Sequence, residues 1–234
     1  MLLDILFSGD NIFVSLLSFV LMVPALLFSL SAHEYGHGYA AYTQGDHYAK
    51  SIGRLTLNPL KHLDPLGTLC LFVVGFGWAK PVPVFPAAFK NGKKSMLIVA
   101  FAGIFVNLIL AIIAIFLGDF LLYCVFSRVA FFATEAGTLI AWVLQYVLME
   151  LAYINIALAV FNLLPIPPLD GYKIFRELLS GRGGNFFAFM ERYATIILIV
   201  FLVFSNRIGL LSALDAAVYN GLDSLIGLLF IAFK

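Results

Sequence analysis

Charged residues are scarce in this chain. Of its 234 residues, 12% are charged and 62% are hydrophobic, whereas soluble globular proteins carry about 25% charged residues. A chain with so little charge cannot cover a water-facing surface, so most of its surface must be solvated by lipid. The sequence therefore predicts an integral membrane protein.

Cysteine is also scarce, and no charge of one sign predominates. Cys70 and Cys124 stand alone in apolar runs without C-x-x-C spacing, which predicts packing residues. With a net charge of +1 and no basic stripe interleaved with aromatics, no nucleic-acid partner is expected. Because repeats, linkers and low-complexity tracts are lacking as well, residues 1–234 are expected to form a single membrane-embedded domain. No separate signal peptide is expected, since the first apolar run is long enough to remain in the membrane.

Apolar runs long enough to cross a bilayer are present instead. A transmembrane helix needs about 20 mostly apolar residues. The predicted spans are residues 12–32, 96–117, 139–164, 193–204 and 208–233. The first of them continues as a helical pattern to Tyr42. We therefore expect an all-α, polytopic membrane protein with about five to six transmembrane helices.

Basic residues gather in two stretches, seven of them within residues 42–95 and four within residues 165–192. The positive-inside rule places both stretches in the cytoplasm. Residues 66–78, inside the first stretch, are apolar but too short and glycine-rich for an ordinary span. A re-entrant loop that turns near residues 75–78 keeps the following lysines on the same side. A bacterial or archaeal plasma membrane is expected, with the functional site toward the cytoplasm.

Residues 33–37, near the end of the first helical pattern, read His-Glu-Tyr-Gly-His, an H-E-x-x-H motif. Positions i and i+4 lie on one face of a helix, so His33 and His37 can bind one zinc ion together. Glu34 can reach a zinc-bound water and act as general base, because zinc lowers the pKa of such a water to about 7. The alternative is a chance match, but ionisable residues packed against an apolar helix are usually functional.

A catalytic zinc takes three protein ligands and keeps one position for water. Asp170 is the best candidate for the third ligand. It follows the third long span, and the loop charges place the end of that span at the same depth as the motif. The alternative is that Asp170 only caps a helix beginning at Tyr172. One zinc ion per chain is thus expected, with His33, His37 and Asp170 as ligands.

Taken together, these motifs resemble the site-2 protease family of intramembrane zinc metalloproteases, in its short form without accessory domains. The resemblance covers most of residues 20–180. Besides H-E-x-x-H, it is carried by GRLTLNP at 53–59, DPLGT at 64–68, GWAKPVPV at 77–84 and NLLPIPPLDG at 162–171. H-E-x-x-H alone occurs in many metalloproteases, but its combination with Leu-Asp-Gly at 169–171 is specific.

The resemblance implies that His33, His37 and Asp170 bind zinc and that Glu34 is the catalytic base. It also implies that Asn162 helps to hold the substrate or the tetrahedral oxyanion, since an amide can donate there without titrating. The alternative for Asn162 is a hydrogen bond at the helix end. The implied activity is regulated intramembrane proteolysis of a single-span membrane protein. The lipid bilayer and this substrate are the expected partners, and a homo-oligomer or a regulatory membrane partner is left open.

Two other functions compete with this interpretation. A membrane metalloprotease of the soluble-facing type would need a glutamate ligand in E-x-x-x-N or E-x-x-x-D spacing. No glutamate after the motif has that spacing. A non-proteolytic metal carrier or scaffold would not need a general base such as Glu34 beside its ligands.

Four further polar residues are assigned less specific roles. His47 and His62, in the loop after the motif, are predicted to be solvated rather than substitute ligands. Asn107 ends a Gly-Ile-Phe-Val-Asn sequence where the family often has Gly-Pro-x-x-Asn, so the asparagine is kept and the proline kink is lost. Glu150, inside the third long span, is expected to face protein or water rather than lipid.

Overall fold

A computed structural model describes residues 12–74, 77–127, 129, 131–132, 134–179 and 183–232, and this part of the chain is mainly helical. The long helices are α2 (Ile12–Thr43), α5 (Gly92–Phe126), α6 (Glu135–Leu163), α9 (Ala194–Ile208) and α10 (Leu210–Ala232). The short ones are α3 (Tyr48–Ser51), η1 (Pro59–Lys61), α4 (Pro65–Val74), η2 (Pro86–Ala88), α7 (Asp170–Leu178) and α8 (Gly184–Arg192). The described residues contain no β-strand, only an isolated bridge. The predicted all-α class is confirmed.

The apolar runs form the long helices. Three are long and apolar enough to cross a membrane, over Phe19–Thr43, Gly92–Phe126 and Glu135–Leu163. Helices α8 and α9 are bent by 75° relative to each other and would count as a fourth span if taken together. The polytopic membrane class is thus confirmed. By length and composition the described residues supply three or four spans, against about five to six expected, and α10 is not among them.

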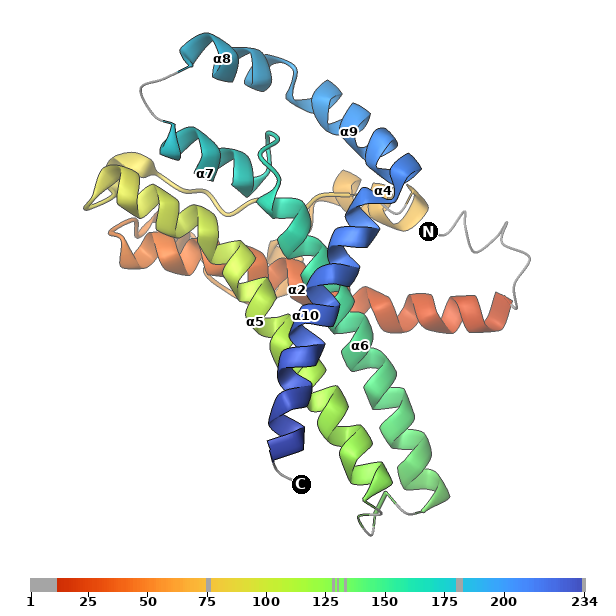
Figure 1. Ribbon diagram of the computed structural model, residues 1–234. Coiled ribbons are helices and arrows are strands. Elements are labelled where there is room, and N and C mark those ends of the chain that lie inside the picture. The colour runs from red at the N-terminus through yellow and green to blue at the C-terminus, as the bar shows by residue number, and fades with distance from the viewer. Residues whose placement is uncertain are drawn as a thin grey trace.

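Helices α5 and α6 run side by side, and α10 packs along both (Figure 1). Small side chains allow this close approach, as is usual for helices packed in membranes. The fully buried residues of this core are Ala111, Ala114 and Ile115 of α5 and Ala152 and Ile156 of α6. Helix α2 lies across the α5–α6 pair and contacts both helices (Figure 1). At that crossing, a Cβ on Gly36 would lie 2.9 Å from the Val106 side chain, so glycine lets the two helices meet.

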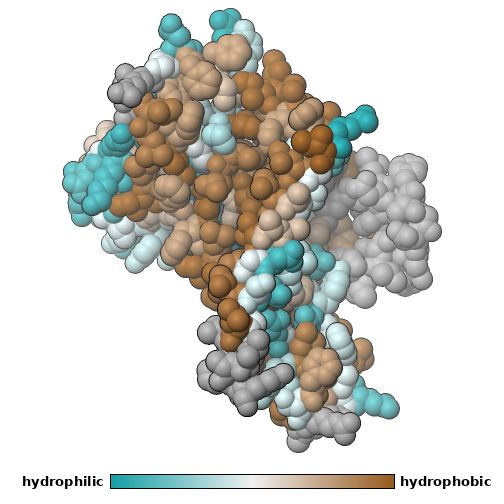
Figure 2. All heavy atoms as spheres, viewed as in Figure 1, coloured by the Kyte–Doolittle hydropathy of each residue, from teal (hydrophilic) through white to brown (hydrophobic). Residues whose placement is uncertain are grey.

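Large apolar side chains cover much of the exterior. Figure 2 shows hydrophobic residues over most of the visible face, with hydrophilic ones mainly at its edges and in a strip over the lower bundle. Phe105, Val200 and Leu228 are each more than 60% exposed. A monomeric soluble protein rarely exposes such extensive apolar surface, so lipid is the solvent that these helices require.

The loop formed by residues 66–78 begins and ends at neighbouring points of the structure. The bridge pairs Leu63 with Ala79 in antiparallel fashion, so the two ends of the loop are adjacent. The first arm is the ten-residue helix α4, and residues 75–76 of the predicted turn at 75–78 lie outside the described residues. This out-and-back path is the one that a re-entrant loop requires.

Arg54 closes the base of this loop. Its guanidinium donates to the backbone carbonyls of Lys61, Lys80 and Pro81. His62 is enclosed here at 1% exposure, with Nε2 2.8 Å from the Thr56 carbonyl oxygen. The prediction of a solvated His62 is therefore wrong, because the ring is buried and its Nε2 contacts the Thr56 carbonyl rather than water. His47 is exposed, as predicted.

Candidate metal centre

Three predicted ligands meet where α2, α5 and α7 converge. His33 and His37 lie one turn apart on α2, and their Nε2 atoms are 3.1 Å apart. Asp170 begins α7, and its Oδ2 lies 3.1 Å from His33 Nε2 and 2.8 Å from His37 Nε2. The three residues are 5%, 7% and 3% exposed. They form a candidate metal-binding cluster within the described part of the chain.

Asp170 reaches the histidines because the chain turns tightly after α6. A Cβ on Gly171 would lie 2.1 Å from the Leu163 carbonyl oxygen, so this turn requires glycine. Helix α7 begins at Asp170 itself, and the carboxylate contacts the two histidines and, 2.7 Å away, Lys173 Nζ. The alternative that Asp170 only caps a helix starting at Tyr172 does not hold.

The second nitrogen of each imidazole faces an acceptor. His37 Nδ1 lies 2.7 Å from the Val99 carbonyl oxygen, which can only accept a hydrogen bond. His33 Nδ1 lies 2.6 Å from Asn107 Oδ1. Each ring therefore donates through Nδ1 and directs Nε2 toward the cluster.

This arrangement requires a cation at the centre of the cluster. Two imidazole lone pairs and a carboxylate oxygen within 3.1 Å of one another repel unless a proton or a metal ion lies between them. Burial alone would raise the pKa of the Asp170 carboxyl, but its contacts with His33 and His37 and the charge of Lys173 hold that pKa well below its ordinary value. The aspartate is therefore ionised at neutral pH, the form that binds a metal.

Zinc fits this set of donors. Two imidazoles and a carboxylate that leave one position open are typical of catalytic zinc sites. At zinc–ligand distances of 2.0–2.2 Å, neighbouring atoms in a tetrahedron lie about 3.3–3.6 Å apart. The observed separations of 2.8–3.1 Å are shorter by about 0.2–0.8 Å. Small side-chain adjustments would therefore accommodate the ion.

Gly103 forms one wall of the cluster. A Cβ at this position would lie 2.5 Å from both His33 Cε1 and His37 Nε2. Because hydrogen bonds to Asn107 and Val99 hold the two rings, neither can move away cheaply. The glycine of the Gly-x-x-x-Asn sequence in α5 thus leaves space for the imidazoles.

We expect Gly103→Ala to weaken zinc binding by about 10–100-fold, the loss typical when the support of a zinc ligand is disturbed. Zinc affinity of the purified protein, measured by competition with a chelator, checks this. Gly118→Ala is the matched control in the same helix, since its Cβ would meet only the flexible end of Met149, at 2.4 Å. Equal zinc affinities for the two variants would contradict the role given to Gly103.

Glu34, the predicted base, is held by the loop that follows α4. Its Oε2 accepts a hydrogen bond from the Val82 backbone N–H over 2.7 Å. Val82 lies between Pro81 and Pro83, which have no N–H to donate. Glu34 is partly buried, next in sequence to the first histidine, and its catalytic role stays a prediction.

The Asn162 side-chain amide is hydrogen-bonded within its own helix, α6. Nδ2 donates to the Leu158 carbonyl oxygen, four residues earlier, over 2.9 Å. This is the helix-end hydrogen bond considered as the alternative. The part of Asn162 in holding substrate or an oxyanion also stays a prediction.

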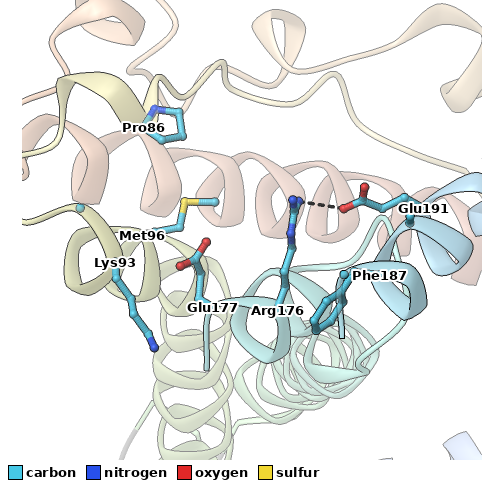
Figure 3. A pocket seen from close by; sticks show the side chains of 10 residues that line it. Pro86, Lys93, Met96, Arg176, Glu177, Phe187 and Glu191 are labelled. Atoms are coloured by element: carbon cyan, nitrogen blue, oxygen red, sulfur yellow. Dashed lines mark ion pairs between the residues drawn. The ribbon is translucent and has the colours of Figure 1, made fainter. Parts of the chain in front are cut away.

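A cavity of about 790 Å³ lies between α5, α7 and α8 (Figure 3). It is lined by residues of α5, α7 and α8, among them Lys93, Met96, Arg176, Glu177 and Phe187. An Arg176–Glu191 ion pair of 2.8 Å joins α7 to α8 at its side (Figure 3). None of the three cluster residues lines it. Helix α7 connects the two sites, with Asp170 at its first residue and the cavity along its last turns.

Three polar residues around the cluster were not predicted as part of the site. No motif in the sequence points to Asn155 or Ser29, and Asn107 has no predicted role, yet all three are 0% exposed. An amide within an apolar span is costly unless it is hydrogen-bonded. That cost was the available signal for Asn155, which lies in the middle of the third long span.

The sequence matches peptidase family M50 over residues 21–205. It is 40% identical over 182 residues to a Bacillus subtilis (strain 168) protein named "Putative zinc metalloprotease YwhC", a match that covers 78% of this chain and 80% of the relative. It is 30% identical over 190 residues to "Putative zinc metalloprotease Rip2" of Mycolicibacterium smegmatis, covering 79% and 67% of the two chains. The protein of the same name from Mycobacterium tuberculosis (strain H37Rv) is 31% identical over 186 residues, covering 78% and 66%. No solved structure matches the chain.

Proposed function

Because the chain belongs to peptidase family M50, the site-2 protease family of zinc metalloproteases, we propose that it cleaves peptide bonds in or near the transmembrane segment of a single-span membrane protein. One observation carries the proposal. The buried cluster of His33, His37 and Asp170 lies between apolar helices, with the glutamate of the H-E-x-x-H motif beside it. A site so placed suits a substrate that approaches through the membrane.

His33, His37 and Asp170 would hold one zinc ion. Zinc bound there supplies a water with a pKa near 7 and polarises the scissile carbonyl. Glu34 would accept a proton from the water that attacks the scissile carbonyl and would give that proton to the leaving amine as the C–N bond breaks. Asn162 donates its amide N–H to the developing oxyanion, once that N–H leaves the Leu158 carbonyl.

The substrate helix has to unwind before cleavage. In an α-helix the carbonyl oxygens accept intrahelical hydrogen bonds, and the helical backbone is not extended. Residues 80–85, between α4 and η2, form neither helix nor strand, so their backbone could pair with an unwound stretch as an added strand. Val82 N–H, bonded to Glu34 here, is a backbone donor that such a stretch could use.

We further propose that the protein lies in a prokaryotic plasma membrane and that its metal centre is on the cytoplasmic side. The end of α2 that carries the motif leads directly into the basic stretch of residues 42–95. Positively charged loops are retained on the cytoplasmic side. Water and the catalytic proton would then come from the cytoplasm.

A substrate series tests the unwinding step. We expect Gly, Asn or Pro near the cytoplasmic end of a model transmembrane substrate to speed cleavage, because these residues weaken the helix. Replacing one glycine by leucine should slow cleavage about threefold to fivefold, since glycine destabilises a helix by up to about 1 kcal/mol. Rates are measured with purified protease and substrate in proteoliposomes.

The same replacements at the opposite end of the substrate helix are the control and should change the rate little. Cleavage rates that do not depend on helix stability at either end would contradict the unwinding model. Cleavage of soluble peptides alone, with no membrane substrate processed, would contradict the proposed function itself.

A further inference from the structure

Four buried polar side chains from three helices form one line of hydrogen bonds that ends at His33. Asn155 of α6 donates through Nδ2 to Ser29 Oγ of α2 over 2.8 Å. Asn107 of α5 donates through Nδ2 to Asn155 Oδ1, also over 2.8 Å. His33 Nδ1 lies 2.6 Å from the remaining amide oxygen of Asn107. Ser29, Asn107 and Asn155 are all 0% exposed, so water does not compete for these contacts.

The orientation of both amides follows from their neighbours. The N and O atoms of an amide are in general assigned from the hydrogen-bond network. Asn155 Nδ2 also lies 2.8 Å from the Leu151 carbonyl oxygen, which can only accept. Ser29 Oγ directs its own hydrogen to the Ala25 carbonyl oxygen 2.7 Å away, so it too accepts from Asn155. Asn155 must therefore turn its oxygen toward Asn107.

The orientation of the Asn155 amide also fixes the tautomer of His33, through Asn107. Asn107 has to meet the Asn155 oxygen with its NH₂ group, which leaves its own oxygen facing His33 Nδ1. That oxygen accepts only, so His33 carries its proton on Nδ1 and offers the Nε2 lone pair to the cluster. His37 is fixed in the same tautomer by a backbone carbonyl, that of Val99.

We propose that Asn107, and Asn155 acting through it, are positioning residues that hold His33 in the tautomer and ring orientation that bind zinc. The inference rests on the proposed zinc chemistry of the site and assigns residues that the H-E-x-x-H and Leu-Asp-Gly motifs do not contain. Partners of the second ring nitrogen orient metal-binding histidines, and their loss typically costs 10–100-fold in metal affinity. Two membrane helices thereby set the geometry of a ligand on a third.

A purely structural role is the competing explanation. Hydrogen bonds between membrane helices contribute modestly to stability, and in this case the asparagines would only hold α5 and α6 together. Their removal would lower the stability of the fold without changing the affinity for zinc. Zinc affinity is therefore the measurement that separates the two roles.

The test measures zinc affinity of the purified full-length protein in detergent, by competition with a chelator. We expect Asn107→Leu to weaken binding by about 10–100-fold. Asn155→Leu should weaken it by a smaller factor, because Asn107 then keeps its contact with His33 but is free to flip. The double variant should bind no more weakly than Asn107→Leu, since Asn155 acts through Asn107; such non-additivity is the mark of coupled residues.

Two further variants serve as controls. Asn155→Asp is expected to keep near wild-type affinity, because a protonated carboxyl can donate to Leu151 while its carbonyl accepts from Asn107. Ile156→Val, at the neighbouring fully buried residue of α6, loosens packing without touching the amides and should not change zinc affinity. Asn155→Ala is measured alongside, so that an answer is obtained even where the leucine variant does not fold.

Wild-type zinc affinity in both Asn155→Leu and Asn155→Ala would overturn the proposal, and so would purely additive losses in the double variant. Absence of zinc binding by the wild-type chain would overturn the proposed function together with this inference. A wild-type chain that binds zinc and cleaves substrate while the asparagine variants keep their affinity would overturn this inference alone.

Discussion

Replacing Glu34 by glutamine is expected to abolish cleavage while zinc still binds at one equivalent per chain. Glutamine has the same shape, and its amide oxygen can still accept the Val82 N–H that Oε2 accepts here. It cannot accept a proton from the attacking water, and a positioned general base contributes about 10²–10⁴-fold to the rate. Cleavage of a membrane substrate and metal analysis of the same preparation measure the two effects.

The matched control for this variant is Glu135→Gln, at the exposed start of α6, which should cleave at the wild-type rate. If the Glu34→Gln protein retained more than about a tenth of wild-type activity, a loss far below the range for a general base, the base would lie elsewhere. The Glu34→Gln variant also distinguishes a protease from a metal carrier. A metal carrier would transport or retain zinc equally well with glutamate or glutamine at position 34.

The positions of the helices could be predicted because long apolar runs leave the backbone few alternatives in a membrane. The predicted spans at 12–32 and 139–164 correspond to α2 and α6. The predicted limits were least accurate in α5, which takes in Lys93 and Asp119 beyond the apolar run. A hydrogen-bonded helix continues past the apolar region, and hydropathy cannot locate its end.

The three cluster residues could be predicted for a different reason. Histidines at i and i+4 with an adjacent glutamate are set by the chemistry of zinc, and that chemistry is visible in sequence. The hydrogen-bond partners of His33 cannot be recognised in the sequence in this way. Whether Asn107 meets Asn155 depends on how α5 and α6 are rotated about their axes, which the packing of small residues such as Ala111 and Ala152 determines.

The burial of His62 shows the same limit in a loop. His62 lies in the loop after the motif, and that position alone predicts a solvated side chain. In the structure, Arg54 donates hydrogen bonds to three backbone carbonyls and so holds together the two ends of the loop in which His62 is buried. Contacts of this kind join segments far apart in sequence and leave no periodic pattern.

Removing the third ligand should have the largest effect on the metal. We expect Asp170→Ala to lose zinc almost completely, with affinity reduced by more than about 100-fold. Even loss of a supporting residue around a zinc ligand costs 10–100-fold, and this variant removes a predicted ligand. The carboxylate also supplies negative charge to the cluster and pairs with Lys173, and the variant loses that charge together with the oxygen donor.

Metal analysis after dialysis against a weak chelator measures this effect, with Glu177→Ala as the matched control. Glu177 lies on the same helix, is partly buried, and lines the neighbouring cavity rather than the cluster, so its variant should retain one zinc. Helix α7 should survive in both proteins, because Asp170 makes no side-chain cap and an acidic residue in the first turn contributes only about 0.3–1 kcal/mol through the helix dipole. Zinc loss in Asp170→Ala alone would then come from the missing ligand. Full zinc occupancy of Asp170→Ala with unchanged affinity would remove Asp170 from the ligand set, and the contacts of its Oδ2 with His33 and His37 would be only hydrogen bonds.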